Sequence, residues 1–275
     1  MATMAKKATY PIEHWSYSSL MSFLRNPLAW HKRYVEGIRD LPSTPSSIIG
    51  RAGHKALEHF YLGATKEEAH RQGLAYLKAV PDFEIEFGKA DSARAKKLKR
   101  QGMEREYEQA IQFYLARAPR YSVLGVEVSS TTRVPGLPLP IKAISDLVVE
   151  SKTDPGAVDV IDHKFVDSFS SLGGDKPLFV LQAIFNYYTV SSAFERPVAR
   201  FILQECKKKK NRDGKSQMRR HIIRFNESRE DFELFHRLLN DATEEIQRQR
   251  TYLPNPSDMF EGKNSFEIYR MKLLE

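Results

Sequence analysis

The run Val158-Asp159-Val160-Ile161-Asp162-His163-Lys164-Phe165 is the stretch of the chain that decides its fold. Its apolar and β-branched residues predict a largely buried β-strand. Side chains alternate between the two faces of a strand, so Asp162 and Lys164 point to the same face. An acid and a lysine inside an apolar strand are costly to bury unless the carboxylate is paired or binds a cation. The strand therefore carries either a structural Asp–Lys pair at a sheet edge or part of a functional site.

A second acid, Asp146, lies in the preceding predicted strand, 139–149. A turn at Asp154-Pro155-Gly156 separates the two strands, and such a connection can bring Asp146 beside Asp162. Two close carboxylates repel each other, and a divalent cation relieves that repulsion. Together with the positive charge of Lys164, they suit metal-assisted phosphodiester hydrolysis, in which a metal activates water and cationic charge stabilises the transition state.

Helical periodicity dominates both ends of the chain, and strands dominate its middle. The expected elements are helical segments at 18–37, 50–80 and 92–118, strands at 123–134, 139–149 and 158–165, a helix at 177–194, strands at 198–206 and 219–225, and a helix at 228–249. This order predicts an α/β fold with an N-terminal helical region. The sequence contains no repeat and no evident linker. We therefore expect one domain over residues 1–275, composed of a mainly helical part (1–120), an α/β core (121–225) and a C-terminal helix and tail (226–275).

The composition is that of an ordinary globular protein, with 275 residues, 41% hydrophobic residues and a net charge of +8. No stretch approaches the ~20 apolar residues of a membrane span, and the N-terminus lacks the apolar segment of a secretory signal. The one cysteine, Cys206, excludes a disulfide framework, a cysteine-based zinc site and an iron–sulfur cluster held by four thiolates of this chain. We expect a cytoplasmic protein with no membrane partner.

Positive charge is concentrated between Lys207 and Arg220, where eight cations face one acid. Asp213-Gly214 at the centre predicts a turn between two strands, so the run is expected to form a basic hairpin tip. It is either a solvated loop that aids solubility or a contact for a polyanion such as DNA. The candidate DNA contacts on the hairpin are Lys207, Lys208, Lys209, Lys210 and Arg212, and Tyr17 is a further candidate near the N-terminus.

Several short motifs occur in a fixed order between residues 16 and 190. They are Ser16–Leu20 followed by Phe23–Pro27 and Arg33–Val35, the Gly-x-x-x-His-x-x-Leu-Glu segment Gly50–Glu58, Glu127 after Leu124-Gly125-Val126, Asp146, Val160–Lys164, and Gln182 within Leu181–Ala183. In this order they resemble the PD-(D/E)XK nuclease superfamily, specifically its RecB/Cas4-like exonuclease branch. Asp146 matches the first acid of the signature, and Asp162-His163-Lys164 matches its (D/E)XK.

The resemblance implies a restriction-endonuclease-like core with a mixed central β-sheet. It also implies Mg²⁺ or Mn²⁺, bound by the side chains of His54, Asp146 and Asp162 and by the backbone carbonyl of His163. An imidazole ligand favours Mn²⁺ more than a pure oxygen site does. Taken alone, His54 would be read as an ordinary histidine on a helix, and only its place in the ordered set of motifs makes it a candidate ligand.

The remaining matched residues would support the reaction. By resemblance, Lys164 orients the attacking water or stabilises charge on the phosphate, and Gln182 holds the site or the DNA backbone. Glu127 tunes the site from its edge or through a second metal, although between Val126 and Val128 it could also be a solvent-facing strand residue. The expected catalytic set is Glu127, Asp146, Asp162, Lys164 and Gln182.

The chain departs from the iron–sulfur members of this branch. Asn26 stands where they carry a cysteine, and no cysteine occurs near the C-terminus, so we expect a member without the cluster. The resemblance implies a DNA exonuclease that acts on single strands or free ends in repair, recombination or phage DNA processing, in a bacterial or phage-infected cell, with a helicase or recombination partner. The alternatives are a nucleic-acid-binding module that has lost catalysis and a structure- or site-specific endonuclease.

Overall fold

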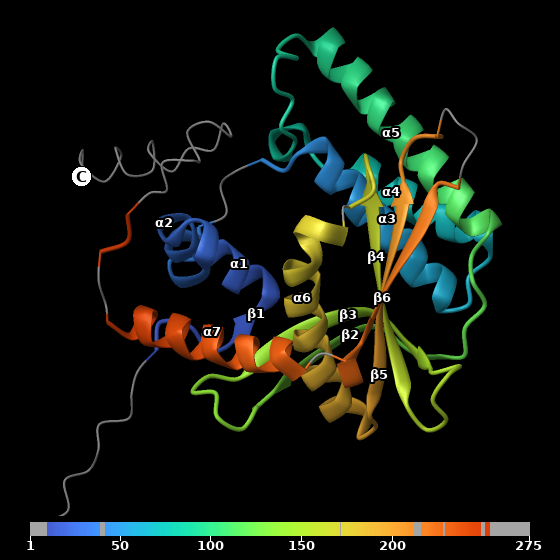
Figure 1. Cartoon of the computed structure of the whole chain (residues 1–275). Coiled ribbons are helices and arrows are strands. Elements are labelled where there is room, and N and C mark those ends of the chain that lie inside the picture. The colour runs from blue at the N-terminus through green and yellow to red at the C-terminus, as the bar shows by residue number, and fades with distance from the viewer. Residues whose placement is uncertain are drawn as a thin grey trace, which may run out of the picture. The chain divides into compact units, whose positions relative to one another are not determined.

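The computed structural model describes residues 10–38, 42–170, 172–211, 216–227, 229–248 and 251–253 (Figure 1). The chain divides into two compact units. One draws on 1–40, 130–143 and 229–275, and the other on 41–129 and 144–228. The three-part single domain expected from the sequence remains a prediction.

The first unit is built around tryptophan side chains. It contains β1 (Trp15–Ser16), α1 (Tyr17–Arg25), α2 (Pro27–Trp30), the π-helical turn η1 (His31–Val35) and α7 (Arg229–Gln247). The first predicted helical segment is broken because Asn26 ends α1 and its side chain accepts a hydrogen bond from the Ala29 N–H (3.1 Å), which caps α2. Trp15 and Trp30 stack with their ring centroids 5.8 Å apart, and both are buried.

The second unit holds most of the helices. They are α3 (Pro45–Tyr61), α4 (Lys66–Ala79), the short 3₁₀ helices η2 (Asp82–Glu84) and η3 (Phe225–Glu227), α5 (Ala93–Ala116) and α6 (Leu172–Phe194). The predicted segment 50–80 is two helices rather than one. Gly63 takes a φ of +102°, which favours glycine, and the Thr65 hydroxyl then accepts a hydrogen bond from the Glu68 N–H (3.1 Å) to cap α4.

The strands form one mixed sheet, which confirms the predicted fold class. They are β2 (Val123–Thr132), β3 (Ile141–Glu150), β4 (Val158–Val166), β5 (Val198–Lys207) and β6 (Met218–Arg224). The strand order is β1-β3-β4-β5-β6, and β2 also pairs with β3. β4 is antiparallel to β3 but parallel to β5, and β6 is antiparallel to β5. The helix α6 makes the crossover that two parallel neighbours require.

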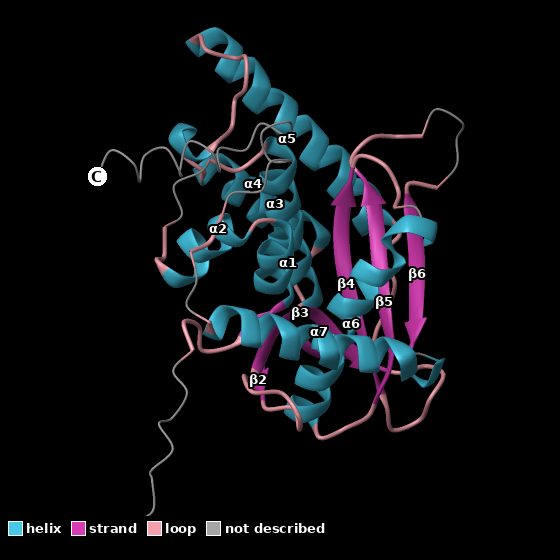
Figure 2. Ribbon diagram, turned by 60° about the vertical axis from the view of Figure 1, so that its left-hand side comes forward, coloured by secondary structure: helices cyan, strands magenta, loops and turns pink. Residues whose placement is uncertain are grey.

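Helices cover both faces of β4 and β5 (Figure 2). Phe165 and Cys206 join a buried apolar cluster with α3, α4 and α5, whereas Asp162 on the other face bonds to Gln182 of α6. The alternation of β4 thus divides its central residues, with Asp162 and Lys164 toward α6 and His163 toward α3 and α5. Among the residues that the structure describes, no helix is both long enough and apolar enough to span a membrane.

Candidate active site

Asp162 and Lys164 on β4 form an ion pair, as their shared face predicts. Lys164 Nζ lies 2.9 Å from Asp162 Oδ2, and Gln182 Nε2 donates a hydrogen bond to Asp162 Oδ1 (2.7 Å). The Oδ2 atom is buried, yet no donor reaches it with the geometry of a hydrogen bond within the described part of the chain. Burial raises the pKa of Asp162, and the nearby Asp146 charge adds to this, against the opposing effect of Lys164.

Asp146 lies where the β3–β4 ladder ends. The paired register runs from Glu150↔Val158 to Leu147↔Ile161, and one position further the Asp146 carboxylate accepts the backbone N–H of His163 (2.7 Å). His54 Nδ1 lies 3.3 Å from the same oxygen. Burial alone would raise the pKa of Asp146, but the charge of His54 and these two hydrogen bonds hold it well below its ordinary value.

His54 is brought to the sheet by a close helix–strand contact. A Cβ added at Gly53 would lie 2.3–2.8 Å from the ring of Phe165, so only glycine lets α3 approach β4 this closely. The next residue then carries its imidazole to Asp146. Burial of the ring lowers the pKa of His54, but the charge and hydrogen bond of Asp146 outweigh it and raise this pKa to about 9.

Glu127 reaches the site through an unusual backbone. Its φ is +49°, a left-handed conformation that is uncommon for a residue other than glycine and that is found at functional sites. This breaks the alternation of β2, so that the half-buried carboxylate lies near Asp146 rather than in solvent. Burial, reinforced by the Asp146 charge, raises the pKa of Glu127 to about 7.

Together, His54, Glu127 and Asp146 form a group whose potential ligand atoms all lie within 4.8 Å of one another. Nitrogen and carboxylate oxygen at this spacing are a donor set for Mg²⁺ or Mn²⁺. Burial is the main cause of the raised pKa of Glu127, and the Asp146 charge adds to it, a repulsion that a cation would relieve. The residues therefore fit the divalent metal that the resemblance of the sequence implies. Asp162 lies outside this group of three in the described residues, and its role as a ligand remains a prediction.

His163 has two separate roles. Its ring lies on the α5 side, where Nε2 bonds to the Tyr114 hydroxyl (2.8 Å) and the ring stacks on Tyr61. Its backbone N–H faces Asp146. Because the N–H and C=O of a strand residue point to the same edge, the His163 carbonyl faces the same edge of β4 as the candidate metal site. Its predicted role as a metal ligand stays a prediction.

Asn186 lies one helical turn after Gln182, and its side chain joins α6 to β3. Ser145 Oγ donates to Asn186 Oδ1 (2.6 Å), and Asn186 Nδ2 donates to the Gln182 carbonyl (2.9 Å). Both residues are buried, and Ser145 directly precedes Asp146. The contact fixes α6 to β3 beside the site. Sequence reasoning missed it because neither residue type signals this pairing.

The basic hairpin is only partly available to a polyanion. Lys208 is 1% exposed and its ammonium pairs with Asp167 (2.9 Å), which argues against the predicted DNA contact at this residue. Lys209 is exposed and pairs with Glu106 (2.8 Å), and half-buried Lys207 bonds to Asn211. Arg212 lies outside the described residues. Tyr17 is half-buried at the start of α1 in the first unit, and its predicted DNA contact stays untested.

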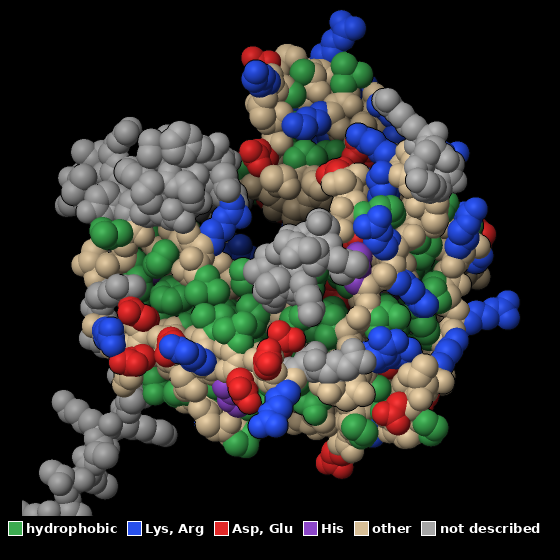
Figure 3. Space-filling model, in the orientation of Figure 1, with side chains coloured by type: hydrophobic (Ala, Val, Ile, Leu, Met, Phe, Trp, Pro, Cys, Tyr) green, Lys and Arg blue, Asp and Glu red, His purple; other side chains and the backbone are tan. Residues whose placement is uncertain are grey.

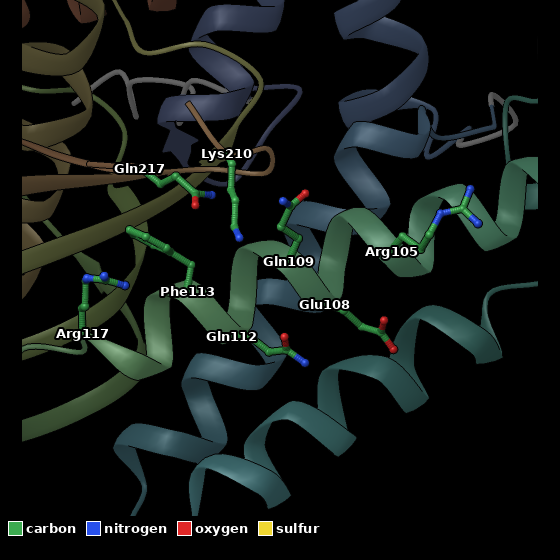
Figure 4. Close-up of a pocket in the computed structure, with 8 residues that line it drawn as sticks. All are labelled: Arg105, Glu108, Gln109, Gln112, Phe113, Arg117, Lys210 and Gln217. Carbon is green, nitrogen blue, oxygen red and sulfur yellow. The ribbon is translucent and has the colours of Figure 1, made fainter. Parts of the chain in front are cut away.

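Lys210 opens onto a shallow pocket between the hairpin and α5 (Figure 4). Arg105 of α5 and Arg117, which directly follows the C-terminal end of α5, line the same pocket. Its volume is about 630 Å³. Lysine and arginine side chains also gather over β5, β6 and α5 on the face seen in Figure 3. The charge pattern keeps the hairpin a candidate DNA contact.

Comparison with known proteins identifies the family. A family model described as the PD-(D/E)XK nuclease superfamily matches residues 14–259. No curated protein matches the sequence. The crystal structure of a candidate exonuclease from Eubacterium rectale superposes with a TM-score of 0.56 at 11% identity, covering 87% of this chain and 83% of that one. That of SSO0001 gives a TM-score of 0.31 at 16% identity, with 82% and 83% covered. The first shows a likeness of fold, and the second is too distant to argue from. By its family match, the chain belongs to the PD-(D/E)XK nuclease superfamily.

Proposed function

We propose that this protein is a divalent-metal-dependent DNA nuclease, and that it acts as an exonuclease on single-stranded DNA or DNA ends. The observation that carries the proposal is the convergence of His54, Glu127 and Asp146 within 4.8 Å, next to the buried Asp162–Lys164 pair. Membership of a nuclease superfamily supports phosphodiester hydrolysis as the reaction. The Eubacterium rectale protein, which is named as a candidate exonuclease, supports the more specific activity.

His54, Glu127 and Asp146 would hold the metal, which when bound supplies water activation and charge neutralisation at the phosphate. The imidazole of His54 favours Mn²⁺ over Mg²⁺. To bind a cation, His54 must give up the proton that its pairing with Asp146 stabilises. Asp146 is then released from His54 but keeps the backbone N–H of His163, which fixes its orientation.

Asp162 and Lys164 act from the α6 face. Lys164 is about one-third exposed, so its ammonium can reach a phosphate while Asp162 and the strand backbone fix its position. It would stabilise the negative charge that develops on the phosphate. Gln182 donates a hydrogen bond to Oδ1 of Asp162, whereas Oδ2 accepts no hydrogen bond within the described residues and faces only the Lys164 ammonium at 2.9 Å. When Lys164 turns toward a phosphate, Oδ2 could accept a proton from water or bind the cation. We propose that Asp162 takes part in the reaction through Oδ2, as a proton acceptor or as a ligand of the cation.

The RecB/Cas4-like branch is part of the proposal. Two of the motifs that resemble this branch support it. The segment Gly50–Glu58 carries His54, which lies beside Asp146, and Gln182 donates a hydrogen bond to Asp162. The chain carries no Gly-x-x-x-x-Gly-Lys-Ser/Thr segment for ATP-driven unwinding. We propose that it acts with a helicase or recombination partner or at an opened DNA end, in repair, recombination or phage DNA processing.

Digestion of end-labelled DNA tests the proposal. The substrates are a linear single strand labelled at its 5′ or 3′ end, a linear duplex and a closed circular single strand, each with Mn²⁺, Mg²⁺ or EDTA. We expect metal-dependent loss of the linear DNA, with the circle intact and the label showing the polarity. Asp146→Ala and Lys164→Ala should abolish the loss.

The other outcomes separate the alternatives. Cleavage of the circle would identify an endonuclease. Tight DNA binding without cleavage under any metal would identify a binding module that retains the architecture of the site. Cleavage that persists in EDTA would contradict the metal mechanism.

A further inference from the structure

A small pocket adjoins the candidate metal ligands on the side of α3 and α4. Its volume is about 360 Å³, and carbon atoms form most of its wall. It lies within the second unit, and two of its residues are the metal-ligand candidates His54 and Glu127. The lining residues are Arg51, His54, Lys55, Glu58, Tyr76 and Glu127.

One face of α3 supplies most of this pocket. Arg51, His54, Lys55 and Glu58 follow the i, i+3, i+4, i+7 spacing that places residues on one helical face. The helix that carries His54 to the metal site therefore carries Arg51 to its flank. Tyr76 comes from the neighbouring helix α4.

Two of the pocket side chains have no partner within the described residues. Lys55 Nζ is paired with both oxygens of Glu58 (3.0 and 2.8 Å), so these two charges cancel. In contrast, neither the guanidinium of Arg51 nor the hydroxyl of Tyr76 has an ion pair or hydrogen bond to any residue described in the structure. Arg51 is exposed and Tyr76 is half-buried. A cation and an aromatic side chain, each with a polar group that has no partner among the described residues, thus flank an open, mainly carbon-lined pocket beside the metal ligands.

We propose that this pocket is a nucleoside subsite, which takes one unpaired nucleotide of the DNA strand next to the scissile phosphate, with the base against Tyr76 and Arg51. The inference rests on the proposed nuclease function and adds the part of the substrate that the site recognises. Aromatic rings and arginine planes are the groups on which unpaired bases stack. The mainly carbon wall suits a base and sugar better than a second phosphate.

The aromatic wall of the pocket favours an unpaired nucleotide. A volume of about 360 Å³ is near the lower end of small-molecule pockets, which span about 300–1,000 Å³. The pocket is open to solvent rather than enclosed, so the selection comes from stacking rather than from its volume. Stacking on Tyr76 also needs a base whose face is free of its neighbour. The subsite would therefore select single strands and frayed ends over intact duplex.

Steady-state cleavage of a linear single strand and a blunt duplex, with Mn²⁺, tests the subsite. Tyr76→Ala should raise KM for the single strand by between about fivefold and 150-fold, the range that loss of one base-stacking aromatic gives, with kcat within about twofold. Tyr76→Phe should keep the wild-type KM, because the ring remains. Arg51→Ala should also raise KM. The matched controls are Phe83→Ala, an exposed aromatic elsewhere in the second unit, and Arg71→Ala, an exposed arginine of α4.

A binding measurement keeps the subsite separate from catalysis. An oligonucleotide with 2-aminopurine at one end or the other, whose fluorescence falls when the base stacks, is mixed with the Lys164→Ala protein and Mg²⁺. We expect quenching that Tyr76→Ala removes and Phe83→Ala does not. An unchanged KM together with unchanged quenching in Tyr76→Ala would overturn the subsite while leaving the nuclease in place. Quenching without any cleavage by the wild-type protein would reject the nuclease function and keep the base site.

Discussion

Binding of a metal by His54, Glu127 and Asp146 should release protons, and the number released follows from the pKa values of these three groups. The pKa of His54 is about 9 and that of Glu127 about 7, so at pH 7 the metal-free site keeps nearly one proton on His54 and about half a proton on Glu127. Both groups must be unprotonated to bind a cation. The low pKa of Asp146 means that it contributes no proton. We therefore expect about 1.5 protons to be released per Mn²⁺ at pH 7, falling to about one at pH 8.

The direction of the pH dependence of Mn²⁺ affinity follows from competition between the metal and the proton for the same atoms. Affinity for Mn²⁺ should rise with pH, by about 30-fold between pH 6.5 and pH 7.5, because the slope of log affinity against pH equals the number of protons released. Isothermal titration of Mn²⁺ in buffers of different ionisation enthalpy measures the release directly. His54→Gln should remove the imidazole proton from the release at pH 7, while the share from Glu127 should rise, because the His54 charge no longer lowers the pKa of Glu127. A release near zero, or an affinity independent of pH, would refute the assignment of His54 and Glu127 as ligands.

Three further predictions test the helix contact, the His54–Asp146 pair and the hairpin. Gly53→Ala should destabilise the protein by about 1–3 kcal/mol in urea unfolding, because the added Cβ overlaps the Phe165 ring. Gly50→Ala, which has open space around it, should not destabilise the protein, and equal effects of the two changes would contradict the close contact. In EDTA, raising the pH from 6.5 through 9 should cost roughly 3 kcal/mol of stability, because the raised pKa of His54 stabilises the fold only while the ring is protonated. His54→Gln should remove most of this loss and leave the smaller part that comes from the raised pKa of Glu127, whereas a flat profile in the wild type would count against the pair. Replacing Lys209 and Lys210 by alanine should make the affinity for single-stranded DNA fall less steeply with salt, with the slope of log affinity against log salt smaller in magnitude by about 1.4. An unchanged slope would remove the hairpin from the interface.

The strand-based part of the site could be predicted from the sequence. Alternation in β4 put Asp162 and Lys164 on one face, and the structure pairs them 2.9 Å apart. Asp146 was predicted beside this strand from the turn between the two apolar runs. The structure places it there, bonded to the His163 backbone. These predictions worked because period-two alternation and a short connection are local properties of the sequence.

The rest depends on contacts that no local pattern encodes. The alternation of β2 gives no sign that Glu127 adopts a φ of +49° and turns its carboxylate toward Asp146. Lys208 reads as one more cation in a basic run, yet it is buried against Asp167 because its position in the fold faces inward. Gly53 looks like an ordinary small helical residue, and only the packing of Phe165 shows why it must be glycine. Each case is decided by tertiary structure rather than by propensity.

The Mn²⁺ dependence of DNA cleavage, compared between the wild-type protein and Glu127→Gln, tests the central claim most directly. The initial rate of digestion of a labelled linear single strand is followed as Mn²⁺ is titrated. The site built from α3, β2 and β3 predicts metal-dependent cleavage by the wild type, and a midpoint at least about tenfold higher in Glu127→Gln with much of the maximal rate restored at high Mn²⁺. Absence of Mn²⁺-dependent cleavage in the wild type, or the same midpoint in both proteins, would contradict it.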